Sequence, residues 1–214
     1  MKHRVYKGAL ALIVVLAALD LYLILSRPSQ VAFKSHKPGA IVRLVEEQGN
    51  TFCSGTVITP HTVLTAAHCV ISQTMLGMSL ERKNIGIRPS NNMDLKVIAN
   101  VKRVRYQMDQ AILEGDFSQF QTAEFIPDVG ALDSNALKHS KMTACGYPLG
   151  GRLFCTTILY IDRDAFMWKV YGLLLPGMSG GPVFLSNGAV IATNVAVEAN
   201  FSIISPIYGL DLEL

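Results

Sequence analysis

A serine surrounded by glycines stands in the segment GMSGGP at residues 177–182, between an apolar run and a strand-like run. A serine hydroxyl is a poor nucleophile at neutral pH. Chemistry at Ser179 therefore requires a nearby base and donors that stabilise the oxyanion formed after attack. The glycines permit close approach, and they let the backbone N–H groups of Gly177 and Ser179 point to one spot. Taken alone, the segment is equally typical of an ordinary Gly-Pro loop, because short motifs match by chance.

A histidine that can act as the base occurs in the segment TAAHC at residues 65–69, which follows the strand-like run CSGTVITP and its turn. His68 is a candidate general base, and its small neighbours Ala66 and Ala67 leave room for tight packing around the imidazole. A bond from Cys69 to Cys53 on the preceding strand could fix the His68 backbone. The other four histidines lie in the N-terminal region or in polar turns, where surface positions explain them.

A carboxylate is needed to orient the imidazole and to stabilise its charged form. Asp109 is the best candidate, because it immediately precedes the apolar run at residues 111–113, which would bury the backbone beside it. Asp94 lies among polar residues, and Asp116 follows Glu114 and a glycine in a turn. Both are interpreted as solvated loop acids.

The elements that must position these residues are strands. Short apolar or alternating runs, separated by turn-forming clusters, extend from residue 40 to about 113 and again from about 141 to 207. A more polar and less regular stretch at residues 114–135 separates the two groups. The expected fold class is all-β, with two packed barrels or a sandwich.

Composition excludes several classes of protein. Of the 214 residues, 50% are hydrophobic and 16% are charged, which rules out a disordered chain, a collagen and a coiled coil. The net charge of +3 comes entirely from residues 1–30, where four Lys and Arg face one Asp. The rest of the chain is electrically balanced, so no nucleic-acid partner is expected.

The N-terminal segment predicts a membrane anchor. Residues 8–25 form an apolar run in which Asp20 is the one ionisable side chain, and a helix of this length spans about 27 Å. The candidate cleavage sites are poor, because neither Val15 with Ala17 nor Leu16 with Ala18 provides small residues at both required positions. This favours an uncleaved signal anchor over a signal peptide. We expect a cytosolic tail at residues 1–7, a stalk at 26–39, and an exported domain that is periplasmic or extracellular. Cleavage would make the domain secreted.

Export would place the four cysteines in an oxidising compartment. Cys53, Cys69, Cys145 and Cys155 allow three pairings, and none has the CxxC spacing of a structural zinc site, so disulfides are expected. The segment between Cys145 and Cys155 contains a proline and two adjacent glycines, which is enough for a hairpin that brings these two cysteines opposite each other.

The blocks CSGTVIT, TAAHC, DQAIL and GMSGGPV, in this order, resemble the chymotrypsin-like (trypsin-like) serine peptidases over roughly residues 40–207. The resemblance implies a peptidase domain at 40–214 with two antiparallel Greek-key β-barrels, at about 40–116 and 136–208, and the active site between them. His68 and Asp109 would come from the first barrel and Ser179 from the second, with the oxyanion hole at Gly177 and Ser179. It also implies a bond between the cysteines at 53 and 69, and neither cofactor nor metal.

One departure from the family pattern concerns activation. Met178 stands where digestive and clotting members have an aspartate that pairs with a newly cut N-terminus, and no IVGG-like start occurs near Ala40. We therefore expect no activation by cleavage. The chain is more similar to compact bacterial or viral members, including the high-temperature-requirement proteases.

The resemblance also places the primary specificity pocket. Its base would be Leu173, with Leu174 adding apolar bulk, and its wall would include Asn194 and Val195. This composition favours an apolar or small side chain before the scissile bond. Glu198 provides an alternative, since it could attract a basic side chain.

Three functions are compatible with these residues. The first is a membrane-tethered serine endopeptidase that cleaves protein or peptide substrates through an acyl-enzyme. The second is a pseudoprotease that binds peptides without cutting them. The third is a non-proteolytic serine acyl hydrolase, which the same machinery permits.

Overall fold

The computed structural model describes residues 37–73, 79–90, 92, 94–132, 137–138, 140–198 and 200–210. The cytosolic tail, the membrane span and the stalk up to residue 36, all predicted from the sequence, lie outside the described residues. Within the described ranges, no helix is both long and apolar enough to cross a membrane.

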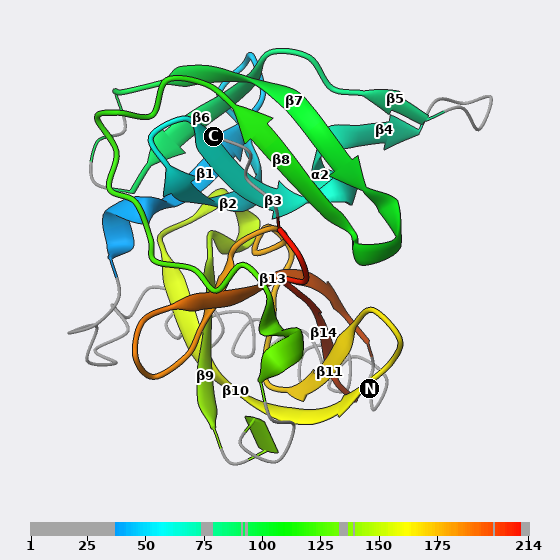
Figure 1. Cartoon of the computed structure of the whole chain (residues 1–214). Coiled ribbons are helices and arrows are strands. Elements are labelled where there is room, and N and C mark those ends of the chain that lie inside the picture. The colour runs from blue at the N-terminus through cyan, green and yellow to red at the C-terminus, as the bar shows by residue number, and fades with distance from the viewer. Residues whose placement is uncertain are drawn as a thin grey trace, which may run out of the picture. The chain divides into compact units, whose positions relative to one another are not determined.

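Two closed antiparallel barrels of six strands each make up the described chain (Figure 1). The first contains β1 (Ile41–Val45), β2 (Thr51–Thr59), β3 (Thr62–Ala66), β6 (Ile85–Pro89), β7 (Val97–Arg105) and β8 (Gln110–Glu114). The second contains β9 (Lys141–Gly146), β10 (Phe154–Arg163), β11 (Trp168–Tyr171), β12 (Pro182–Phe184), β13 (Val190–Val197) and β14 (Ser202–Pro206). The expectation of an all-β fold with two barrels is confirmed.

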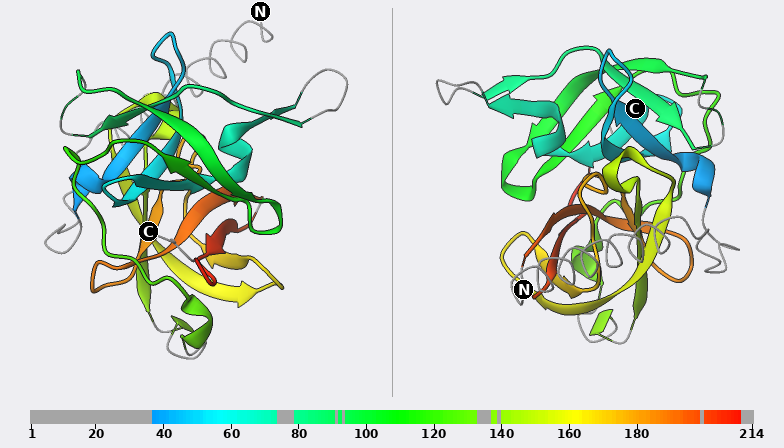
Figure 2. Two further views of the ribbon diagram at one scale, coloured as in Figure 1. Left: turned by 45° about the horizontal axis from the view of Figure 1, so that its top comes forward. Right: turned by 180° about the vertical axis from the view of Figure 1, so that it is seen from behind.

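Both barrels have the same strand order. In each, the first three strands follow one another, and the third pairs with the last strand of the barrel: β3 with β8, and β11 with β14. A separate hairpin of β4 (Ile71–Gln73) and β5 (Ser79–Glu81) projects from the first barrel (Figure 2).

The short helical elements lie between the strands or before the first one. The helix α2 (Ala67–Val70) follows β3 directly, and the 3-10 helix η2 (Tyr106–Met108) leads into β8. Two further 3-10 turns, η1 (Pro38–Ala40) and η3 (Val129–Ala131), precede β1 and β9, and η4 (Pro148–Gly150) lies between β9 and β10.

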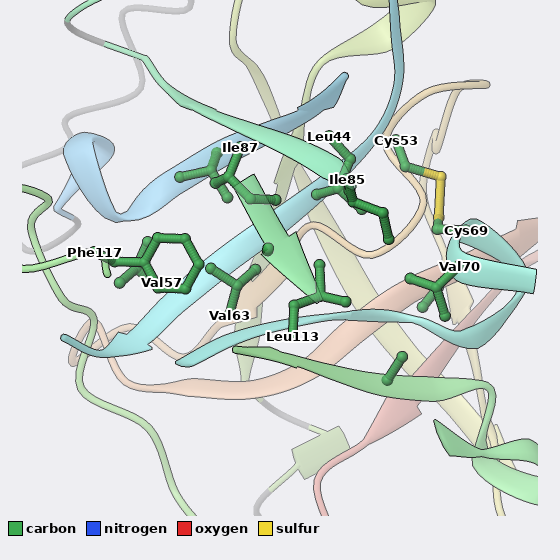
Figure 3. Close-up of a cluster of buried hydrophobic side chains, with 14 of the residues drawn as sticks. Leu44, Cys53, Val57, Val63, Cys69, Val70, Ile85, Ile87, Leu113 and Phe117 are labelled. Atoms are coloured by element: carbon green, nitrogen blue, oxygen red, sulfur yellow. A yellow bond between two sulfur atoms is a disulfide. The ribbon is translucent and has the colours of Figure 1, made fainter. Parts of the chain in front are cut away.

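Each barrel has its own apolar core. In the first, side chains from all six strands point inward together with residues of α2 and of the loop after β8, among them Leu44, Val63, Ile87 and Leu113 (Figure 3). The second barrel is filled around the fully buried ring of Trp168. The inward-facing residues recur at every second position of several strands, as the pleat requires.

A third apolar cluster joins the barrels. Its buried members come from β1, β2, β3 and β8 of the first barrel and from β9, β10, β12 and β13 of the second, with Ile207 and Leu210 from the C-terminal end of the described chain. Because these side chains are withdrawn from water only when the barrels are together, they stabilise the interface along which the site is built.

Two disulfides are present, with the pairings that the resemblance and the hairpin argument predicted. Cys53 of β2 is bonded to Cys69 of α2, with their Cα atoms 6.1 Å apart. Cys145 and Cys155 lie directly opposite each other on β9 and β10 and are bonded, with a Cα separation of 4.1 Å. The first bond ties the element that carries His68 to the strand beside it.

Replacing Cys53 and Cys69 together by alanine should lower the free energy of unfolding by about 3 kcal/mol, because the bond closes a loop with a sequence separation of 16 residues in the unfolded chain. Urea titration followed by circular dichroism measures the loss. The Cys145/Cys155 double variant, with a separation of 10, is the matched comparison and should lose slightly less. Peptide mapping without reductant should recover these two linked pairs, and free thiols or a link from Cys53 to Cys155 would contradict the assignment.

Candidate active site

His68 and Asp109 are brought together by strand pairing. In the antiparallel pair of β3 and β8, Ala66 at the end of β3 lies opposite Gln110 at the start of β8. The residue before β8 therefore meets the first turn of α2, and the Ala67 N–H donates to the Asp109 carbonyl over 3.0 Å. Two residues that are 41 positions apart in the chain thus become neighbours.

The Asp109 carboxylate holds His68 at two points. One oxygen, Oδ2, lies 2.6 Å from the ring atom Nδ1, and the other, Oδ1, accepts the backbone N–H of His68 over 2.8 Å. This contact favours the tautomer with the proton on Nδ1, which leaves Nε2 as the acceptor. The His68 side chain is 46% exposed and that of Asp109 is 18% exposed, so the imidazole is oriented from behind and open in front.

Asp109 adopts a left-handed backbone conformation, with φ 44° and ψ 45°, where η2 ends. Aspartate is one of the few residues other than glycine that adopt this region without severe strain. The Asp109 N–H donates to the Tyr106 carbonyl over 3.1 Å, and this bond closes the turn that aims the carboxylate at α2.

Ser179 reaches this pair because the residue after it has no side chain. Gly180 has φ +79°, and a Cβ atom there would overlap the Thr65 hydroxyl of β3 and the Ser54 carbonyl of β2. The Ser54 N–H donates to the Ser179 carbonyl over 2.8 Å, and the Gly180 N–H donates to the Asn194 carbonyl over 2.8 Å. The serine turn of the second barrel is therefore hydrogen-bonded to β2 and lies close against β3, the strand that leads into α2.

The Ser179 hydroxyl donates to the Val195 carbonyl over 3.3 Å. Between the described residues, no hydrogen bond joins this hydroxyl to the His68 ring. Catalytic hydrogen bonds are often long or unformed in free enzymes and tighten when substrate binds. Rotation of the Ser179 side chain about one single bond is the change needed to redirect its hydroxyl.

Two backbone N–H groups of the serine turn, those of Gly177 and Ser179, have no acceptor in the described chain. Their directions are fixed from the other side, because a planar trans peptide points its N–H away from its C=O. The Pro176 carbonyl accepts from the Leu149 N–H over 2.8 Å. The Met178 carbonyl accepts from the Gly181 N–H over 3.0 Å and from the Asn194 side chain over 3.2 Å. Such free, oriented donors are what an oxyanion requires.

An apolar cavity of about 210 Å³ adjoins Ser179. It is lined by Leu174, Leu175, Pro176, Met178, Ser179 and the β13 residues from Asn194 to Val197. Three of the residues assigned to the specificity pocket from the sequence, at positions 174, 194 and 195, line this cavity.

Leu173, assigned to the base of the pocket, does not line it. Leu173 is 49% exposed, whereas Leu174 is 3% exposed. Glu198 is exposed and does not line the cavity either. Met178 is fully buried, where it packs in the second core as well as against the cavity.

Sequence reasoning missed the groups that hold the serine turn. Ser54 and Leu149 contact it through hydroxyl and backbone atoms. The one available signal was the position of Ser54 within the block that resembles the peptidase family.

Comparison with known proteins gives one family and several solved structures. The model of the trypsin-like peptidase domain matches residues 53–192. No curated protein sequence matches this chain significantly.

The solved structures share the fold at low sequence identity. A serine endoprotease from Yersinia pestis is 15% identical, with a TM-score of 0.65 over 85% of this chain. The active form of the Rv3671c protease from M. tuberculosis is 19% identical, with a TM-score of 0.58 over 79% of this chain and 76% of its own. The HtrA-type protease AlgW with a decapeptide is 14% identical, with a TM-score of 0.63 over 82%. The chain spans 64% of the Yersinia chain and 62% of the AlgW chain, less than two thirds of either. Because the family model covers more than half of its length, this chain belongs to the trypsin-like peptidase domain family.

Proposed function

We propose that this protein is a serine endopeptidase. The observation that carries the proposal is the 2.6 Å contact between His68 Nδ1 and Asp109 Oδ2 at the point where the Ser179 turn docks on the first barrel. In this mechanism Nε2 of His68 accepts the Ser179 proton while Oγ attacks the substrate carbonyl, and the imidazolium then protonates the leaving amine. Water attacks the acyl-enzyme by the same route, which regenerates the serine.

The free N–H groups of Gly177 and Ser179 are assigned to the negative oxygen of the tetrahedral intermediate. These N–H groups need little reorientation during the reaction, because the carbonyls of their peptide units already accept hydrogen bonds from Leu149, Gly181 and Asn194. The AlgW structure, which is described with a decapeptide, supports a peptide as the substrate class.

A second candidate function is peptide binding without turnover. It is favoured by one observation, the bond from the Ser179 hydroxyl to the Val195 carbonyl, which leaves the serine turned from the base. A fluorophosphonate probe separates the two functions, because it labels only a serine that a base activates.

Location outside the cytosol, with an N-terminal membrane anchor, is part of the proposal. Its support is the apolar run at residues 8–25 together with the two disulfides, which persist in oxidising compartments.

Ser179→Ala and His68→Ala should each reduce turnover of a peptide substrate by about 10⁴-fold or more, with similar losses, because the two residues act as a unit. Steady-state kinetics and fluorophosphonate labelling are the measurements. The exposed Ser186 supplies a control, and Ser186→Ala should keep full labelling. A His68→Ala chain with near wild-type cleavage would contradict the assignment.

Activity should not depend on where the chain begins within residues 26–37. Met178 presents an apolar side chain that is buried in the second core, so a new N-terminal ammonium group has no carboxylate to pair with there. The carbonyl groups of Pro176, Gly177 and Met178 already accept hydrogen bonds from within the domain. Chains that start at several positions in this range should have kcat values within about threefold of one another. Strong dependence on a single start would show that cleavage activates the protein.

The apolar cavity beside Ser179 should select an apolar or small side chain before the scissile bond. A charged side chain entering it would lose hydration without gaining a partner, which disfavours Asp, Glu, Lys and Arg by at least about tenfold. Sequencing the products from a mixed peptide library gives the preference, and Glu198→Gln should leave it unchanged. Dominant cleavage after Lys or Arg that disappears in Glu198→Gln would make Glu198 the specificity residue instead.

A further inference from the structure

Ser54 is a fully buried residue of β2, and its hydroxyl and N–H are bonded to the serine turn and to the segment that supports it. Its hydroxyl donates to the Gly177 carbonyl over 2.7 Å and accepts the Tyr147 N–H over 2.9 Å. Its own N–H donates to the Ser179 carbonyl, and its carbonyl accepts from the Thr65 hydroxyl over 2.7 Å. One side chain of the first barrel thus holds two segments of the second.

These two segments control the same glycine. Gly177 has φ +93° and no side chain, so the peptide units on both sides of it can rotate at low energetic cost unless their carbonyls are held. Ser54 holds the Gly177 carbonyl directly. The Pro176 carbonyl is held by the Leu149 N–H, and Leu149 lies two residues after Tyr147, whose N–H bonds to the Ser54 hydroxyl.

The segment that carries Leu149 needs such support. Leu149 has φ +51°, a conformation that is unfavourable for a leucine, and its side chain is 73% exposed and contributes little packing. The first barrel braces this segment elsewhere: the Tyr147 hydroxyl donates to the Ile41 carbonyl over 2.9 Å, and the Arg43 guanidinium donates to the Gly151 carbonyl over 2.9 Å. Burial raises the pKa of Tyr147 to about 12, so its hydroxyl stays a donor at neutral pH.

We propose that Ser54 is a positioning residue that keeps the N–H groups of Gly177 and Ser179 directed at the oxyanion, the role that a buried ion pair cannot fill here because residue 178 is methionine. The inference rests on the proposed peptidase function and extends it to a residue that does not touch substrate. Loss of the hydroxyl leaves the buried Tyr147 N–H and the partly buried Gly177 carbonyl without this partner, so both segments gain freedom.

Ser54→Ala should therefore lower kcat by about 10- to 100-fold with KM within about twofold, somewhat less than deletion of one oxyanion donor. The affinity for a peptide aldehyde, whose adduct with Ser179 carries the oxyanion, should fall by the same factor as kcat/KM. The affinity of a non-reactive peptide, measured in the Ser179→Ala background with and without Ser54→Ala, should not change.

Ser202→Ala is the matched control. Ser202 is also a buried serine whose hydroxyl donates to a glycine carbonyl, that of Gly172, over 2.8 Å. Its loss should lower Tm by a similar amount and leave kcat unchanged. Ser54→Thr and Ser54→Val form a second pair of variants. Their side chains have nearly the same volume, but only threonine has a hydroxyl, so the pair tests the hydrogen bonds of residue 54 if Ser54→Ala does not fold. Ser54→Thr should turn over at least about tenfold faster than Ser54→Val.

Three results would overturn the proposal: a folded Ser54→Ala chain with wild-type kcat, a loss confined to KM, or equal kcat values for Ser54→Thr and Ser54→Val. A wild-type chain that neither cleaves peptides nor reacts with fluorophosphonate would instead overturn the proposed function, and with it this role.

Discussion

The close approach of Gly180 to Ser54 of β2 and Thr65 of β3 is the constraint on which the site depends. The backbone of the second barrel approaches that of the first so closely that no side chain fits between them, and the Ser54 N–H then bonds the Ser179 carbonyl. The barrels also share an apolar cluster, but apolar burial has no direction and would tolerate a small shift. The hydrogen bonds across Gly180 are directional, so they fix the position of Ser179 relative to the histidine that follows β3.

The two halves of the site differ in how they are built. Within the first barrel, the pairing of β3 with β8 is sufficient to bring His68 and Asp109 together, and the bond from Cys53 to Cys69 adds a covalent tie. The second barrel supplies a turn of glycines whose own backbone has many possible conformations. That turn obtains its shape from outside, through carbonyls that are held by Leu149, Asn194 and Ser54.

This difference explains what could be predicted from the sequence. Strand runs, the candidate residues at 68, 109 and 179, and the hairpin that pairs Cys145 with Cys155 leave marks in residue type and spacing, whereas the bond from Cys53 to Cys69 was implied by the family resemblance. Leu173 was assigned to the pocket from its spacing to Ser179 along the chain, and that spacing does not reveal which of the neighbouring leucines lines the cavity. Ser54 and Leu149 act on backbone carbonyls, which every residue has, so no pattern of side chains reveals their partners.

In the proposed peptidase mechanism, the resting position of the Ser179 hydroxyl is a smaller obstacle to catalysis than a misdirected backbone would be. Its bond to the Val195 carbonyl is long, at 3.3 Å, and a neutral hydrogen bond contributes only about 0.5–1.5 kcal/mol net. Rotating the side chain to the imidazole therefore slows the reaction by about tenfold at most. Loss of one oriented oxyanion donor slows acyl transfer by about 10²–10³-fold, because the negative oxygen then lacks one of the hydrogen bonds that stabilise it. Stabilisation of the Gly177 and Ser179 N–H groups therefore matters more to the rate than a preformed bond between serine and histidine, and the buried Ser54 hydroxyl supports the more important of the two.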